Sequence, residues 1–270
     1  MLSVPLGPLA LPVAPLLLLA AVWLAAALAR RGAGIAAENV VWIAAGLGLL
    51  AARAGHLLRH ADAYAASPAA MLDLRDGGFW AAPGWTAAGL WLAWRAASAP
   101  PLRRALGAAA LAGVALWGGT SLLLDRVSAG GDAALPAIDL AGLNDGRLRP
   151  LPELAVGQPT VINLWASWCG PCRAEMPMLA AAQQRERGIR FLFVNQGESA
   201  ATVQAYLRRE GLALDGVWLD PASRAGPAFG SRGLPTTLFI DAAGRRVDAH
   251  FGVLNAAALK ARLNALNASR

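Results

Sequence analysis

Hydrophobic residues are unevenly distributed along the 270 residues of the chain. Before about residue 125 they form long, nearly uninterrupted runs, whereas beyond it they form short runs separated by polar residues, glycines and prolines. A helix needs about 20 mostly apolar residues to cross a bilayer, while runs of about four to eight residues are typical of buried strands. The pattern therefore predicts a transmembrane region at 1–125, a linker rich in Ser, Gly and Asp at 126–136, and a separate α/β domain at 137–270.

Four apolar segments of the first region are candidate transmembrane helices, and the third is the shortest. They cover residues 9–29, 40–58, 80–94 and 106–124. The first segment is followed by Arg30 and Arg31, whereas a signal peptide carries its charges before the apolar core. We therefore interpret the first segment as a membrane helix and expect four transmembrane helices.

Arginines indicate how these helices cross the membrane. Arg30 and Arg31 lie in the first predicted loop, and Arg95, Arg103 and Arg104 lie in the third, where no acidic residue balances them. Loops rich in Lys and Arg are retained in the cytoplasm. We therefore expect a multi-pass membrane protein whose N-terminus and C-terminal domain both lie outside the cytoplasm.

The composition agrees with a membrane protein and argues against a nucleic-acid partner. Hydrophobic residues make up 56% of the chain and charged residues 15%, which is too apolar for an ordinary soluble protein. The formal net charge of +7 could suggest nucleic acid, but the basic residues form no dense run. We therefore predict the lipid bilayer as a partner and no nucleic acid.

The only two cysteines, Cys169 and Cys172, form a C-x-x-C motif between a predicted strand at 160–164 and a predicted helix at 174–184. The strand is expected because its run is short and β-branched, and the helix because it is rich in Ala, Leu, Met and Glu. Cys169 would then lie near a helix N-terminus, where unpaired N–H groups favour a thiolate. Since a buried second thiol can resolve a mixed disulfide, the motif predicts redox chemistry.

A zinc site and a structural disulfide are the alternatives for this motif. Structural zinc needs four ligands, but no other cysteine exists, and His56, His60 and His250 are scattered along the sequence. A disulfide that closes so short a loop removes little chain entropy and is a weak staple. We therefore expect no metal site and favour a redox-active disulfide.

The sequence that surrounds the cysteines carries a resemblance to a known family. The string Asn163-Leu-Trp-Ala-Ser-Trp-Cys-Gly-Pro-Cys-Arg-Ala-Glu-Met-Pro177 resembles the TlpA/ResA-like branch of the thioredoxin family. The resemblance covers about residues 137–268. It implies a thioredoxin fold, in which helices flank a central mixed sheet. The apolar segments place a region of four transmembrane helices before it.

The resemblance also implies roles for individual residues. Glu175 matches the acid near the cysteines in this branch, while Asn163 stands where cytosolic thioredoxins carry a buried Asp. Pro235 matches the cis proline beside the disulfide in this family, and the backbone of the preceding residue, Leu234, would pair with the substrate. The alternative is that Pro235 only marks the beginning of a strand, a position where proline is common. The other supporting residues implied by the motif are Trp168, Gly170 and Pro171.

A thiol:disulfide reductase anchored in the bacterial inner membrane, with its thioredoxin domain in the periplasm, is the function that the resemblance implies. The Gly-Pro pair between the cysteines resembles reducing thioredoxins, and the substrates would be protein disulfides, in cytochrome c biogenesis or periplasmic redox homeostasis. No cofactor beyond the disulfide is expected. Because the membrane region has no cysteine, a membrane electron donor of the DsbD or CcdA type is implied. A thiol–disulfide oxidase or isomerase on the same fold is the alternative.

The membrane region, over about 10–125, resembles the first part of prolipoprotein diacylglyceryl transferases. The match includes Ala52-Arg-Ala-Gly-His56, but Ala82 stands where that family has a catalytic His, so we expect a degenerate relative without acyl transfer. Arg53 and His56 either contact a lipid headgroup or reach toward the outer interface, and we favour the second interpretation. A lipid-binding or lipid-modifying membrane protein with a redox output domain is the alternative from a different functional class.

Overall fold

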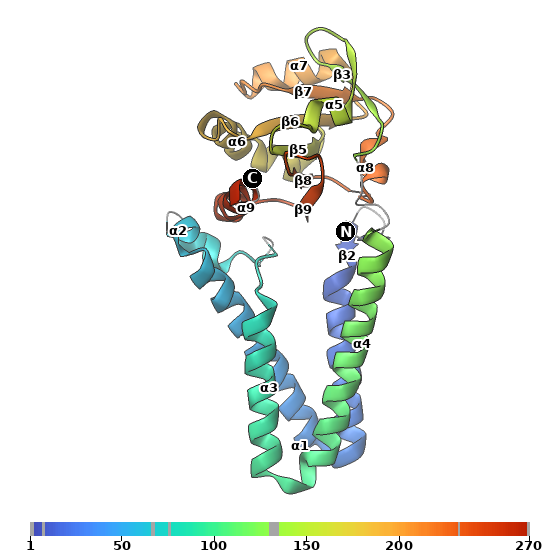
Figure 1. Cartoon of the computed structure of the whole chain (residues 1–270), viewed down its shortest axis with the longest axis vertical. Helices are drawn as coiled ribbons and strands as arrows, with labels where there is room; N and C mark the ends of the chain where they lie inside the picture. Colours follow the sequence, from blue (N-terminus) through green and yellow to red (C-terminus); the bar gives the residue numbers. More distant parts are fainter. Residues whose placement is uncertain are drawn as a thin grey trace. The chain divides into compact units, whose positions relative to one another are not determined.

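The computed structural model describes residues 3–6, 9–65, 68–74, 77–129, 135–231 and 233–268. The chain forms two compact units, one made of Val13–Tyr64 with Gly77–Val127 and the other including Ser128–Arg270. A short antiparallel hairpin of β1 (Ser3–Leu6) and β2 (Leu9–Pro12) precedes the first long helix. The two units have different architectures. In Figure 1, where colours follow the sequence, the helical unit is blue to green and most of the other unit is yellow-green to red.

Long helices build the first unit, as Figure 1 shows. The helices of the N-terminal half are α1 (Val13–Arg59), α2 (Ala61–Tyr64), α3 (Ala81–Ser98) and α4 (Arg103–Ala129), with 3₁₀ helices at Pro68–Leu72 and Pro100–Leu102. Small residues allow these helices to pack closely, because Ala26, Ala37 and Ala109 are buried together in one cluster. The helical character predicted for this half is therefore confirmed.

The chain reverses its direction inside α1. Backbone angles leave the helical region at Ala33 and Gly34, and Gly34 adopts a φ of 76°, which residues with a Cβ rarely tolerate. Nη1 of Arg30 lies 3.2 Å from a carboxylate oxygen of Glu38, eight residues further on. Eight residues of a straight helix rise about 12 Å, so this ion pair forms more easily across the turn at Ala33 and Gly34 than along a straight helix.

The predicted number of membrane helices is not confirmed. Among the described residues, two helical stretches are long and apolar enough to cross a membrane, Pro15–Arg59 and Pro100–Leu123. α3 is shorter and carries Arg95 near its end, and it does not reach that standard. The first segment also begins later than predicted, because Leu9–Pro12 forms strand β2 and the helix begins only at Val13.

Arg53 is buried within the helical unit. It is only 7% exposed, and its Nη1 donates a hydrogen bond to the carbonyl oxygen of Gly78 at 2.9 Å. Its guanidinium lies 5.5 Å and 5.9 Å from the ring centroids of Tyr64 and Phe79, within the range of cation–π attraction. Arg53 is therefore held by groups of the protein, and His56 is half-buried.

The second unit is a mixed sheet of seven strands in the order β4-β3-β7-β6-β5-β8-β9, with helices flanking it (Figure 1). Its strands are β3 (Asp139–Gly142), β4 (Leu148–Pro150), β5 (Thr160–Trp165), β6 (Arg190–Gln196), β7 (Val217–Asp220), β8 (Thr236–Ile240) and β9 (Arg246–Phe251). Its helices are α5 (Leu151–Ala155), α6 (Gly170–Arg185), α7 (Ala200–Arg209), α8 (Ala225–Ala228) and α9 (Ala256–Ala268). The predicted thioredoxin-like α/β fold with a mixed sheet is therefore confirmed.

Strand β5 lies inside the sheet and determines which side chains face the helix that follows it. It pairs in parallel with β6 and antiparallel with β8, and all six of its residues are buried. Because successive side chains of a strand point to opposite faces, Val161, Asn163 and Trp165 share one face. Val161 and Trp165 pack in the same cluster as Met176 of α6, so Asn163 is placed beneath that helix.

Residues 148–154 do not form a single strand. β4 ends at Pro150, which has no N–H to continue the ladder. Leu151 and Leu154 then lie on one face of the short helix α5 and are buried against the sheet. The periodicity of three residues, rather than two, marks this change in the chain.

Candidate active site

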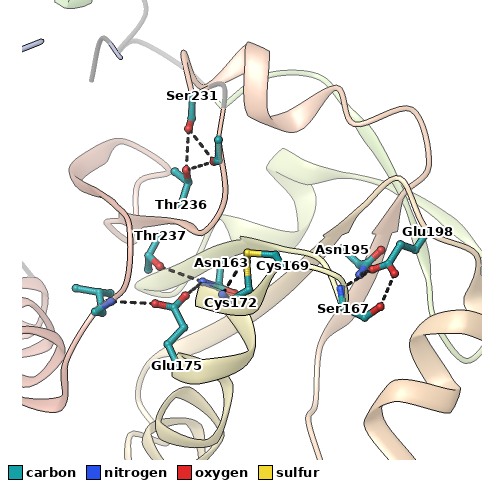
Figure 2. Close-up of a disulfide and its surroundings, with 12 residues drawn as sticks. Asn163, Ser167, Cys169, Cys172, Glu175, Asn195, Glu198, Ser231, Thr236 and Thr237 are labelled. Carbon is teal, nitrogen blue, oxygen red and sulfur yellow. Dashed lines mark hydrogen bonds between the residues drawn. A yellow bond between two sulfur atoms is a disulfide. The ribbon is translucent and has the colours of Figure 1, made fainter. Parts of the chain in front are cut away.

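The two cysteines form a disulfide at the N-terminus of α6 (Figure 2). Their Cα atoms are 5.2 Å apart, and the Cys172 backbone N–H donates to Sγ of Cys169 at 3.2 Å. Cys169 caps the helix, and Gly170 and Pro171 form its first two positions. Cys169 is 5% exposed and Cys172 is fully buried. Cys169 is therefore the sulfur that another disulfide can reach, and the helix N–H groups can stabilise its thiolate.

The surface beside the disulfide is formed by two segments. Trp168 precedes Cys169 and is 71% exposed. The Leu234–Pro235 peptide bond is cis, as the resemblance implied. β8 begins at Thr236, which pairs with Leu164 near the end of β5, so Pro235 lies at the same end of the sheet as the cysteines.

A buried carboxyl group lies behind the disulfide, as Figure 2 shows. Glu175 of α6 is 1% exposed, and its Oε1 accepts a hydrogen bond from Nδ2 of Asn163 at 2.9 Å. Its Oε2 accepts from the backbone N–H of Leu254 at 2.9 Å. Burial raises the pKa of Glu175 to about 7, although the hydrogen bonds from Leu254 and Asn163 oppose the shift. Glu175 can therefore gain or lose a proton near neutral pH.

Asn163 connects this carboxyl group to the strand that follows the cis proline. Its Nδ2 also donates to Oγ1 of Thr237 at 3.0 Å, so one amide bridges α6 and β8. Asn163 is 1% exposed and Thr237 is fully buried. The structure thus brings together four of the residues singled out in the sequence, the two cysteines, Asn163 and Glu175, whereas Arg53 and His56 belong to the other unit.

A second carboxylate near the motif was missed by the sequence analysis. Glu198, in the loop after β6, accepts from the backbone N–H of Ser167 at 2.7 Å and from its hydroxyl at 2.5 Å. Nδ2 of Asn195 donates to the same carboxylate at 2.7 Å (Figure 2). A usable signal did exist, because carboxyl ends of parallel strands meet at one edge of a sheet, and Asn195 and Glu198 lie at the end of such a strand.

A disulfide that caps the helix after a central strand defines the thioredoxin-like class of proteins. The model of the Redoxin family matches residues 129–263, which is half of the chain. The chain therefore belongs to the redoxin family.

Curated relatives agree with this assignment. The thiol:disulfide interchange protein HelX of Rhodobacter capsulatus is 36% identical over 93 residues, covering 34% of this chain and 52% of HelX. The thiol-disulfide oxidoreductase ResA of Halalkalibacterium halodurans is 35% identical over 110 residues, with coverages of 40% and 61%. A thiol:disulfide interchange protein DsbE homolog of Paracoccus denitrificans is 32% identical over 152 residues, with coverages of 54% and 82%.

The chain spans about half to three fifths of the length of the first two relatives. Their names support the predicted enzyme class, a thiol:disulfide oxidoreductase.

Proposed function

We propose that the chain is a membrane-anchored thiol:disulfide reductase whose redoxin unit faces the periplasm of a bacterium. The observation that carries the proposal is the Cys169–Cys172 disulfide at a helix N-terminus, with the buried carboxyl group of Glu175 on the next turn of that helix. One sulfur is near the surface and the other is buried, which suits attack followed by resolution.

The reaction begins from the reduced dithiol. The Cys169 thiolate attacks one sulfur of a substrate disulfide, a mixed disulfide forms, and the other substrate sulfur leaves as a thiolate. The Cys172 thiolate then attacks Sγ of Cys169 and releases the second substrate sulfur. Two electrons pass from the dithiol to the substrate, and the two protons lost by the cysteines end on the two substrate thiols.

Glu175 handles the proton of the buried thiol. It lies three residues after Cys172 on α6, a spacing that places two side chains on the same helical face. Cys172 must lose its proton before it can attack, and no water-exposed surface is available to a fully buried residue. A carboxylate with a pKa of about 7 accepts this proton and passes it on at neutral pH.

The substrate is held against the surface formed by Trp168 and the cis proline segment. The backbone of Leu234 pairs with the polypeptide that carries the disulfide, and Pro235 keeps that backbone beside Cys169. Protein disulfides are therefore the substrate class, and disulfides formed in cytochrome c biogenesis or in general periplasmic redox homeostasis are the expected members. Trp168 supports this assignment because so large an exposed aromatic side chain favours protein contacts.

The direction proposed is reduction. The Gly-Pro pair between the cysteines resembles that of reducing thioredoxins, whose potential is about −270 mV. In an oxidising periplasm such a dithiol must be re-reduced, and the chain has no cysteines besides Cys169 and Cys172. A membrane electron donor of the DsbD or CcdA type is therefore part of the proposal.

The helical unit is proposed as a multi-pass anchor in the lipid bilayer of the inner membrane. The two apolar stretches and the arginine-rich first and third loops support this topology. Alkaline phosphatase fused after Leu123 should be active, and the same enzyme fused near Gly34 should be inactive. The reverse pattern would show that the redoxin unit faces the cytoplasm.

Activity and direction can be tested on the full chain in mild detergent. Equilibration with glutathione redox buffers should give a reduction potential of about −270 mV for the Cys169–Cys172 pair. The reduced chain should cleave insulin disulfides. A reduction potential of about −120 mV would instead support an oxidase. Cys169→Ser should abolish cleavage, and Cys172→Ala should trap substrates as mixed disulfides that mass spectrometry identifies.

A further inference from the structure

The segment that leads to Cys169 is tied to a neighbouring loop by a single carboxylate. Glu198 accepts both the backbone N–H and the hydroxyl of Ser167, at 2.7 and 2.5 Å. Ser167 lies two residues before Cys169, and the exposed Trp168 lies between them. Every polar hydrogen of Ser167 is thus directed at Glu198 (Figure 2).

Glu198 is itself fixed from both sides along its own chain. Nδ2 of Asn195, at the fully buried end of β6, donates to its Oε2 at 2.7 Å. Gly197, with a φ of 76°, lets the chain turn between these residues. Ser199 caps α7 by accepting the backbone N–H of Thr202 at 3.2 Å. The carboxylate therefore stands on a loop that is anchored to a strand at one end and to a helix at the other.

We propose that Glu198 is a positioning residue, which holds Trp168 and Cys169 in the orientation needed for attack on a protein disulfide. The inference rests on the proposed function, because it assigns Glu198 a part in the same exchange reaction. Glu198 touches neither sulfur, and it acts through Ser167.

The physical reason is the geometry of thiol–disulfide exchange. The attacking sulfur must meet a substrate sulfur at a defined position while the substrate lies against the protein surface, and small misplacements slow such reactions strongly. Between β5 and α6, the backbone N–H of Cys169 bonds to the carbonyl oxygen of Ala166 at 3.2 Å. The bonds from Ser167 to Glu198 fix this short segment from the other side. A small alkylating reagent needs no such alignment, so it provides a contrast.

The test compares two reactions of the full chain in detergent, cleavage of insulin disulfides by the reduced protein and alkylation of Cys169 by iodoacetamide. The variants are Glu198→Gln, Glu198→Ala, Ser167→Ala and the double variant Glu198→Ala with Ser167→Ala. Gln keeps the length of the side chain, but its NH₂ group replaces one of the two accepting oxygens. It cannot accept a hydrogen bond from Ser167 or Asn195, so one contact is lost. Asp241→Asn is the matched control, since Asp241 accepts backbone N–H groups of Ala243 and Arg245 in the turn after β8.

We expect Glu198→Ala to slow insulin cleavage about tenfold and Ser167→Ala about threefold, with alkylation changed less than about threefold in both. Because the two residues act as a unit, the double variant should also lose about tenfold rather than about thirtyfold. Glu198→Gln should lie between the wild type and Glu198→Ala, and Asp241→Asn should cleave insulin at the wild-type rate.

Two results would overturn the role of Glu198. One is insulin cleavage at the wild-type rate in Glu198→Ala and Glu198→Gln. The other is a pair of equal losses: alkylation of Glu198→Ala slows as much as its insulin cleavage, and Asp241→Asn cleaves insulin as slowly as Glu198→Ala. That pattern would indicate general destabilisation. A wild-type chain that cannot cleave insulin would instead contradict the proposed function, so the two failures are distinguishable.

Discussion

Two carboxylates near the disulfide have nearly the same hydrogen bonds but different surroundings. Glu175 accepts hydrogen bonds from Nδ2 of Asn163 on β5 and from the backbone N–H of Leu254. Glu198 accepts hydrogen bonds from Nδ2 of Asn195 on β6 and from the backbone N–H of Ser167. Glu175 is 1% exposed, whereas Glu198 is half-buried.

The difference shows that burial, rather than the hydrogen-bond partners, decides what each group can do. Desolvation outweighs two good donors at Glu175 and raises its pKa to about 7, so this group can exchange protons near neutral pH. Glu198 keeps contact with solvent and gains a further donor in the Ser167 hydroxyl. It is therefore suited to holding a segment in place.

The largest expected effect is on stability against pH. The pKa of Glu175 is about 7 in the folded chain and near 4.5 in the unfolded chain, so between these values the folded state binds more protons. The contribution of Glu175 to stability is therefore fully present below about pH 4.5 and is lost as pH rises through 7, by on the order of 3 kcal/mol. Hydrogen exchange of the β5 amides in the oxidised full chain, corrected for intrinsic rates, measures this fall.

Glu175→Gln should remove most of that slope, because an amide does not titrate in this range. Asp241→Asn serves as the control, because hydrogen bonds and Arg245 lower the pKa of Asp241. Its contribution to the pH dependence of stability therefore lies at a pH below the range in which Glu175 titrates. Equal slopes in the wild type and in Glu175→Gln would show that another group carries the pH dependence.

The next effect is on the rate of exchange. Glu175→Gln should slow insulin cleavage at pH 7 about tenfold, because Cys172 loses its proton acceptor. In the wild type, the alkylation rate of the reduced protein against pH should show an inflection near 7. This inflection should be absent in the variant, and superimposable curves with equal cleavage rates would exclude proton transfer by Glu175.

Asn163→Asp sharpens the comparison by adding a second carboxyl group beside Glu175. Two buried carboxyl groups cannot both ionise easily, so the apparent pKa of the pair should rise by about one unit and the cleavage rate at pH 7 should fall about threefold. Asn195→Asp makes the same change beside Glu198. It should leave the pH profile unchanged, and a shift there of equal size would remove the distinction between the two sites.

The smallest effect is expected for Thr237→Val, which removes one hydrogen-bond partner of the Asn163 amide but keeps the shape of the side chain. It should lower the free energy of unfolding by about 1 kcal/mol. Cleavage of insulin should stay within about twofold of the wild-type rate, because both donors to Glu175 are kept. A loss as large as that of Glu175→Gln would mean that Thr237 itself takes part in proton transfer.

The elements around the cysteines were predictable because their signals are local. Strand β5 was expected at 160–164 and is Thr160–Trp165. Helix α6 was expected at 174–184 and begins earlier, at Gly170, because Cys169 acts as its cap. Cys172 and Glu175 lie one helical turn apart, so their proximity also follows from spacing alone.

Contacts between distant segments were not predictable in this way. Whether Asn163 meets Thr237 depends on the register of β5 with β8, and the donor at Leu254 comes from the connection before the last helix. Glu198 was missed for the same reason, since its partner Ser167 lies on another strand connection. Burial of Arg53 was also missed, because its partners Gly78 and Phe79 belong to a different helix connection.

The positive φ of Gly34 affects whether the chain crosses the membrane an even or an odd number of times. Without the reversal, the 47 residues of α1 would form a rod about 70 Å long, more than twice a hydrocarbon core of about 30 Å. In the proposed topology, the reversal divides α1 into a pair of crossings, and a further pair returns the chain to the side from which it started. In the proposed topology one backbone conformation thus keeps the reactive dithiol on the same side of the membrane as the N-terminus. A residue with a Cβ at this position would strain the turn on which that pairing depends.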